Sequence, residues 1–126
     1  MRIILADHHP HALWALKTML QEESELEIVG EVVDAERLFM LVENATADLV
    51  LVDRKLPGCH IKDLISDLHA LEPRPIVIVM SSNPEDSRLM LKAGADAFVS
   101  KGDQPDWLLE TLHQYQKRTK NVNHPE

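Results

Sequence analysis

The chain has 126 residues, of which 44% are hydrophobic and 27% charged, a composition that fits one soluble domain with a single core. A formal net charge of −8 argues against unaided binding to nucleic acid or to an anionic membrane, because the protein's own field repels phosphate. The single cysteine, Cys59, excludes an internal disulfide, and the apolar stretch before Asp7 is too short for a signal peptide or a membrane span, so we expect a cytoplasmic protein.

In the first half of the chain, two apolar runs alternate with two helical patterns. Residues 3–6 form a continuous apolar run rich in β-branched residues. The next run, residues 28–33, is interrupted by Gly30 and Glu31, which predicts a more exposed strand near an edge. Pro10 and Asp34 mark the expected starts of the two helices. Their apolar stripes are Ala12, Ala15, Leu16, Met19 and Leu20, then Leu38, Leu41 and Val42.

The second half repeats this alternation three more times. Residues 49–52, 76–80 and 97–99 are continuous apolar runs, which is typical of strands buried on both faces. Pro84 and Pro105 stand near the starts of the last two helices, and Gly94 is a good stop for the first of these. The three apolar stripes are Ile61, Leu64, Ile65, Leu68 and Leu71; Leu89 and Met90; and Leu108, Leu109, Leu112 and Tyr115.

Strand followed by helix, repeated five times, predicts an α/β fold in which a doubly wound parallel sheet is joined by right-handed crossovers. Reactive or charged side chains follow four of the apolar runs: Asp7, Asp53, Ser81 and Lys101. Ligands of such sheets bind beyond the carboxyl ends of the strands, so we expect these four side chains to meet at one rim.

The chemistry of this set is coherent. The carboxylate of Asp53 can act as a nucleophile toward a phosphoryl group, which adds nearly two negative charges and three strong acceptors. A lysine ammonium and a hydroxyl can then bind the new oxygens, and a second carboxylate helps to hold Mg²⁺.

These residues resemble the landmarks of the response regulator receiver (CheY-like) family, and of its NarL/LuxR-type branch in particular. Asp7-His8-His9-Pro10, the segment Asp-Arg-Lys-Leu-Pro-Gly over residues 53–58, Ser81-Ser82 and Lys101 match in order and spacing, and the similarity covers about residues 1–118. The resemblance implies a flavodoxin-like five-stranded sheet of order 2-1-3-4-5 with five helices. We place the receiver domain at residues 1–120 and a polar tail at 121–126.

The resemblance also implies a function in two-component signal transduction. It implies that a sensor histidine kinase phosphorylates Asp53, that Lys101 contacts the phosphate and that Ser81 supplies the switch hydroxyl, with Ser82 as the neighbouring alternative. Phe98 falls where the family places its switch aromatic residue. We expect a phosphoacceptor domain rather than an enzyme, with self-catalysed phosphotransfer and dephosphorylation at most.

The expected cofactor is Mg²⁺, held by Asp7, Asp53 and the backbone carbonyl of Lys55. The family normally carries a second acid after the first strand, but His8 occupies that place here. Because Mg²⁺ prefers oxygen ligands, we expect weak binding, and whether His8 is a ligand stays open. The alternative function is a pseudo-receiver, a phosphorylation-independent protein-interaction module.

The histidines near residue 8 allow two further hypotheses. His8, His9 and His11 suggest a transition-metal site in the acidic pocket, although no cysteine lies close in sequence. Alternatively, a protonated His8 pairs with Asp53 or Asp7 and replaces part of the missing metal charge. Two milder departures from the family are His60-Ile61 in place of Asp-Gly, and Gly102 where a proline with a cis peptide bond is common.

Two tryptophans suggest a partner surface. Trp14 and Trp107 lie off the apolar stripes of the first and last predicted helices, which this topology places on the same face of the sheet. Exposed tryptophan is enriched at interface hot spots, whereas the alternative is that each ring packs onto its neighbours. We expect a homodimer through these two helices or through the face of helix 4, strand 5 and helix 5. We expect this domain itself to bind neither nucleic acid nor membrane.

The third class of function is a flavodoxin-like enzyme or cofactor carrier. The chain has four glycines and no glycine-rich phosphate-binding loop, and the charged segment after residue 6 is unlike a flavin-phosphate loop.

Overall fold

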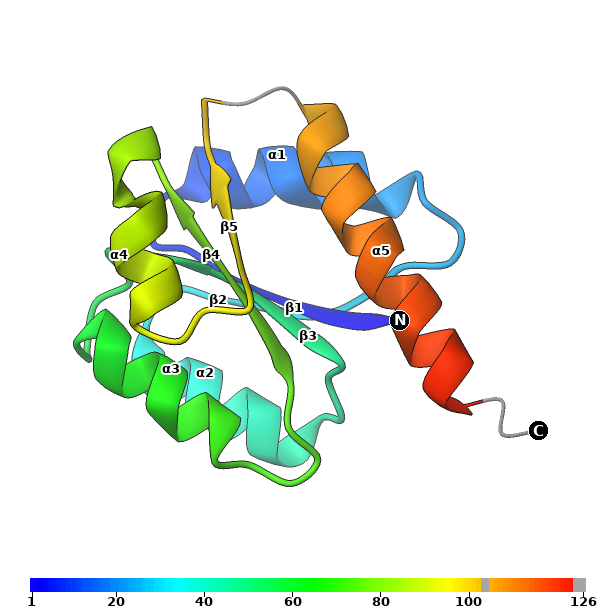
Figure 1. The fold of residues 1–126 in the computed structure, drawn as a ribbon, viewed down its shortest axis with the longest axis horizontal. Coiled ribbons are helices and arrows are strands. Elements are labelled where there is room, and N and C mark those ends of the chain that lie inside the picture. Colours follow the sequence, from blue (N-terminus) through cyan, green and yellow to red (C-terminus); the bar gives the residue numbers. More distant parts are fainter. Residues whose placement is uncertain (103–104, 124–126) are drawn as a thin grey trace.

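Five parallel strands alternate with helices along the chain (Figure 1). The computed structural model describes residues 1–102 and 105–123, the side chains of residues 118–123 excepted. The strands are β1 (Arg2–Ala6), β2 (Glu27–Val32), β3 (Leu49–Asp53), β4 (Ile76–Ser81) and β5 (Ala97–Ser100). The helices are α1 (Pro10–Gln21), α2 (Ala35–Asn44), α3 (Ile61–His69), the 3-10 turn η1 (Pro84–Asp86), α4 (Ser87–Lys92) and α5 (Pro105–Asn123).

The strands pair in the order β2-β1-β3-β4-β5, which confirms the predicted topology. Helices α1 and α5 cover one face of the sheet, and α2, α3 and α4 lie on the other (Figure 1). This is the flavodoxin-like arrangement, whose layers bury both faces of the central strands.

Successive side chains of β1 alternate between the two faces of the sheet, which explains why its apolar run is continuous. Ile3 and Leu5 join the core beneath α1 and α5, while Ile4 and Ala6 join the core beneath α2 and α3. All four are fully buried, as is every residue of the matching run 49–52 in β3. Successive side chains point to opposite faces of a strand, so a strand covered on both sides has no polar positions.

Strand β2 is the exposed edge strand that the sequence predicts. Its residues are mostly half-buried or exposed, and its pairing with β1 shifts register between Ile3 and Ile4. A Cβ at Gly30 would overlap the side chain of Leu41 in α2, so a larger residue at this edge would require Leu41 to shift. Val33, which we predicted to be the last residue of this strand, lies outside it.

The helix boundaries follow the predicted signals. Pro10 is the first residue of α1, and the Asp34 side chain caps α2 by accepting a 2.8 Å hydrogen bond from the Arg37 backbone N–H. Gly94 follows α4 with φ of +110°, a conformation that glycine adopts without strain. His60 caps α3 with its ring nitrogen, 3.2 Å from the Lys62 backbone nitrogen, which gives this departure from the family a structural role.

The predicted limits of the domain stay predictions. Helix α5 continues to Asn123, so residues 121–123 of the predicted tail are helical, and residues 124–126 lie outside the described residues. Among the helices that the structure describes, none has the length and apolarity needed to cross a bilayer.

Candidate functional site

The carboxyl ends of β1 and β3 bring two carboxylates together. Ala6 pairs with Val52 in the sheet, so Asp7 and Asp53 leave neighbouring strands at the same level. Asp7 is fully buried and Asp53 is 4% exposed. Two carboxylates that are withdrawn from water and adjacent repel each other, so this arrangement requires a cation.

Lys101 supplies that cation from the end of β5. Its Nζ lies 2.5 Å from Asp7 Oδ2 and 3.0 Å from Asp53 Oδ1. Burial alone lowers the pKa of Lys101, but its hydrogen bonds to Asp7 and Asp53 and the attraction of their charges outweigh burial and raise the pKa overall. The Lys101 backbone N–H also donates a 2.8 Å hydrogen bond to the Ser81 carbonyl, which fixes the root of the side chain.

His8 and His9 lie beside the same two carboxylates, one on each. His8 Nδ1 is 3.8 Å from Asp53 Oδ2, and His9 Nδ1 is 3.2 Å from Asp7 Oδ1. The two imidazole rings are close neighbours, with centroids 3.9 Å apart and planes inclined at 41°. One ligand atom from each of Asp7, His8, His9 and Asp53 lies within 4.8 Å of every other, whereas His11 is not a member of this cluster.

Ser81 is the last residue of β4 and is buried, and its hydroxyl forms hydrogen bonds to residues other than Asp53. It donates a 2.6 Å hydrogen bond to Asp86 Oδ2 and accepts one of 3.1 Å from the Asn83 backbone N–H. Ser82, the alternative switch residue, is exposed. Both serines line the hollow beside Asp53, so which of them serves as the switch hydroxyl stays a prediction.

Lys55 contacts Asp53 through its backbone. The Lys55 N–H donates a 3.1 Å hydrogen bond to Asp53 Oδ2 across the turn that follows β3. The role of its carbonyl as a metal ligand stays a prediction. The hollow above Asp53 has a volume of about 380 Å³ and is lined by His8, His9, Asp53, Arg54, Lys55, Ser81, Ser82 and Asn83.

The predicted convergence at one rim is therefore observed for Asp7, Asp53 and Lys101, with Ser81 lining the same hollow. Arg54 and Asp86 also belong to this site, although no sequence pattern indicated them. Arg54 Nη1 lies 2.7 Å from Asp86 Oδ2, the oxygen that also holds Ser81. Arg54 stands next to Asp53 in the chain, which was a usable signal, but nothing in the sequence pairs it with Asp86 in η1.

The sequence of this chain matches a known protein family. Residues 3–113 match the family described as the response regulator receiver domain. The chain belongs to this family, whose members are signalling modules of two-component systems and are generally not enzymes. It is a receiver domain of the NarL/LuxR type.

Two curated relatives and one solved structure illustrate the similarity. The nitrate/nitrite response regulator protein NarL of Escherichia coli K12 is 32% identical over 114 residues, which cover 89% of this chain and 53% of that protein. The transcriptional regulatory protein DegU of Brevibacillus brevis is 29% identical over 114 residues, 89% of this chain and 48% of DegU. RcsB of Salmonella enterica serovar Typhimurium, bound to a promoter with the phosphomimetic BeF₃⁻, superimposes with a TM-score of 0.81 at 26% identity, covering 90% of this chain and 66% of RcsB. The chain thus spans about half the length of the curated relatives it matches.

Receiver domains bind Mg²⁺ at the acidic pocket, and the residues here fit that ion only in part. The carboxylates of Asp7 and Asp53 are suitable hard oxygen donors, but Lys101 already holds one oxygen of each. The other ligand atoms of the cluster are the imidazole nitrogens of His8 and His9, which Mg²⁺ does not favour.

Proposed function

We propose that this domain is a phosphorylation switch in which a sensor histidine kinase transfers a phosphoryl group to Asp53. A carboxylate oxygen of Asp53 forms the new O–P bond while the P–N bond of the kinase phosphohistidine breaks, and the nitrogen keeps the bonding electron pair. The observation that carries the proposal is the Lys101 ammonium, placed within 3.0 Å of both Asp7 and Asp53 in a shared buried pocket. The transfer is at most self-catalysed by the receiver, so the domain is a phosphoacceptor and not an enzyme acting on a separate substrate.

The remaining side chains respond to the added charge. Lys101 neutralises part of it, and Ser81 turns its hydroxyl toward the phosphoryl oxygens, which are stronger acceptors than any it now has. Phe98 is half-buried against the core beneath α4, and its side chain moves together with that of Ser81. The readout is a shift between two populated states of the output surface.

Mg²⁺ binds weakly in this proposal, through Asp7, Asp53 and the Lys55 carbonyl, and it supplies charge neutralisation when bound. Residues of the chain itself position the Asp53 carboxylate. Lys101 holds Asp53 in place, and the Lys55 backbone N–H orients its Oδ2.

Phosphorylation is tested by incubating the protein with acetyl phosphate and Mg²⁺ and measuring its intact mass. We expect a gain of about 80 Da that is absent in Asp53→Asn. An unmodified mass after treatment that phosphorylates a reference receiver would contradict the proposal.

The second candidate is the pseudo-receiver, favoured by His8 in the place of a metal-binding acid. It predicts the opposite result in the same experiment: no modification, together with partner binding that Asp53→Asn leaves unchanged.

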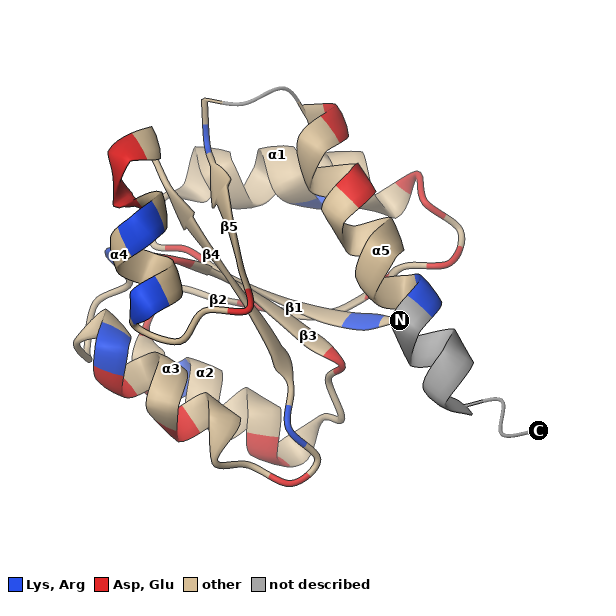
Figure 2. Ribbon diagram, in the orientation of Figure 1, with Lys and Arg blue, Asp and Glu red and all other residues tan. Residues whose placement is uncertain are grey.

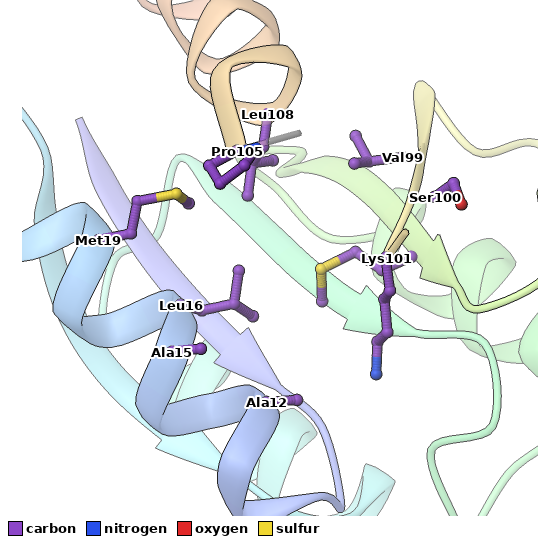
Figure 3. A pocket seen from close by; sticks show the side chains of 10 residues that line it. Ala12, Ala15, Leu16, Met19, Val99, Ser100, Lys101, Pro105 and Leu108 are labelled. Atoms are coloured by element: carbon purple, nitrogen blue, oxygen red, sulfur yellow. The ribbon is translucent and has the colours of Figure 1, made fainter. Parts of the chain in front are cut away.

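For partners we propose homodimerisation through α1 and α5. Trp14 is 69% exposed and Trp107 is 63% exposed, so both residues present most of their surface to solvent. Between the two helices lies an apolar cavity of about 300 Å³, to which α1 contributes Ala15 and Leu16 and α5 contributes Leu108 (Figure 3). Tryptophan is enriched among the residues that anchor protein interfaces.

The face of α4, β5 and α5 is the alternative interface. Leu89 and Leu91 of α4 are 53% and 47% exposed, which leaves apolar surface on this side as well. Basic residues lie scattered among acidic ones on the described helices (Figure 2), and with the net charge of −8 this supports the expectation that the domain itself binds no nucleic acid.

A further inference from the structure

Each of the two buried carboxylates divides its oxygens between different partners. Lys101 Nζ is bonded to Asp7 Oδ2 and to Asp53 Oδ1. The other two oxygens, Asp7 Oδ1 and Asp53 Oδ2, are the ones nearest to His9 and His8. A cation placed between the imidazoles therefore uses oxygens that the ammonium does not occupy.

The charge of the pocket also favours a cation. Two carboxylates with one ammonium leave one net negative charge, and both carboxylates are almost completely buried, where charges are weakly screened. The hollow of about 380 Å³ that His8, His9 and Asp53 line gives an ion and its water a route of entry.

The donor set identifies the kind of cation. Two imidazole nitrogens and two carboxylate oxygens suit a four-coordinate ion of the zinc class, with bonds of about 2.0–2.2 Å. Such bonds place neighbouring ligand atoms roughly 3.3–3.5 Å apart, and the four atoms now lie within 4.8 Å of one another. Both imidazoles are partly exposed, His8 by 37% and His9 by 57%, so rotation of their rings can close the difference.

We propose that Asp7, His8, His9 and Asp53 form a binding site for a divalent transition-metal ion, selective for Zn²⁺ over Mg²⁺. His8 stands where the family has a second acidic residue, so an imidazole nitrogen replaces a carboxylate oxygen there. The neighbouring His9 adds a second nitrogen donor. The site requires no phosphorylation, but it shares Asp7 and Asp53 with the switch proposed above.

The test is equilibrium dialysis of the untagged, unphosphorylated protein against Zn²⁺ in the presence of excess Mg²⁺. We expect one Zn²⁺ per chain, and a d–d absorption band typical of four-coordinate geometry when Co²⁺ replaces Zn²⁺. His8→Ala and His9→Ala each weaken Zn²⁺ binding by about tenfold or more, the equivalent of at least 1.4 kcal/mol.

His11→Ala is the matched control, because His11 is exposed on α1 and lies outside the cluster, and it leaves Zn²⁺ affinity unchanged. Urea unfolding without metal checks that each variant is folded. Zn²⁺ affinity that persists in the His8→Ala/His9→Ala double variant, or equal competition by Mg²⁺, would overturn the proposal. A protein that accepts phosphate but binds no Zn²⁺ would overturn this inference alone.

Discussion

Arg54 and Asp86 form an ion pair, with 2.7 Å between Arg54 Nη1 and Asp86 Oδ2, and the same oxygen accepts the 2.6 Å hydrogen bond from Ser81. A hydroxyl has one proton to donate. Ser81 therefore has to leave Asp86 before it can donate to a phosphoryl group on Asp53. The pair between Arg54 and Asp86 thus stabilises the arrangement that this structure shows against the phosphorylated one.

Removing that restraint favours the phosphorylated arrangement. We predict that Asp86→Ala raises the affinity for beryllofluoride, a phosphoryl mimic, by about tenfold, because a hydrogen bond to a charged group contributes about 1.5–3 kcal/mol. Isothermal titration with saturating Mg²⁺ measures the change. Glu85→Ala, which removes the adjacent exposed carboxylate, is the matched control and leaves the affinity at the wild-type value. An unchanged or weaker affinity in Asp86→Ala would show that Ser81 is not restrained by this contact.

Asp86 also makes the stability of the fold depend on pH, and the direction of this dependence follows from its pKa. The Ser81 hydrogen bond lowers the pKa of Asp86 and burial opposes this, while the hydrogen bond and charge of Arg54 and the charge of Lys55 lower the pKa further. A lowered folded-state pKa contributes stability that is complete above the unfolded pKa of about 3.9 and is lost as pH falls through the folded value. We predict that Asp86→Asn shows a smaller loss of urea midpoint than wild type between about pH 5 and pH 3. Glu85→Gln, measured in parallel, keeps the wild-type pH dependence.

Lys101 is the cation on which the two buried carboxylates depend. We predict that Lys101→Met lowers the free energy of unfolding by about 1–3 kcal/mol, because it leaves buried charged groups without a partner. Urea denaturation at neutral pH measures this loss. Adding Asp7→Asn removes the repulsion between the carboxylates and restores part of the stability. If the losses of stability caused by Lys101→Met and Asp7→Asn simply add in the double variant, then Lys101 does not act by balancing the charges of the two carboxylates.

The ion preference of the pocket follows from residue 8. We predict that His8→Asp raises Mg²⁺ affinity by about tenfold or more, because it supplies a hard, charged oxygen donor next to Asp7. The same variant reacts faster with acetyl phosphate, which intact mass spectrometry over time records. His11→Asp adds the same charge outside the pocket and separates donor chemistry from net charge. Similar gains in both variants would exclude direct ligation by residue 8.

The fold was predictable because its signals are local. Continuous apolar runs such as residues 49–52 are typical of strands covered on both faces, and Pro10, Asp34 and Gly94 mark helix ends through backbone chemistry. The rim followed from topology, since parallel strands end at one edge. Asp53 and Ser81 turned out to be the final strand residues rather than the residues after the strands.

The network around Ser81 was not predictable for a physical reason. Arg54 and Asp86 are 32 residues apart in the chain, and their side chains meet because they follow the ends of β3 and β4, which pair in parallel. No periodicity records such a contact. The division of carboxylate oxygens between Lys101 and the two histidines likewise depends on side-chain orientation, which sequence patterns do not encode.

Trp14 and Trp107 test the proposed dimer without disturbing the fold. Both rings are more than 60% exposed, so their removal leaves stability within about 0.5 kcal/mol. We predict that Trp14→Ala/Trp107→Ala shifts the protein from dimer to monomer in sedimentation velocity, because exposed aromatic anchors contribute about 2 kcal/mol or more at an interface. Leu89→Ala/Leu91→Ala on α4 is the matched control and leaves the dimer intact. The reverse result, with dissociation only in the α4 variant, would assign dimerisation to the face of α4, β5 and α5, and would leave the two tryptophans available for another partner.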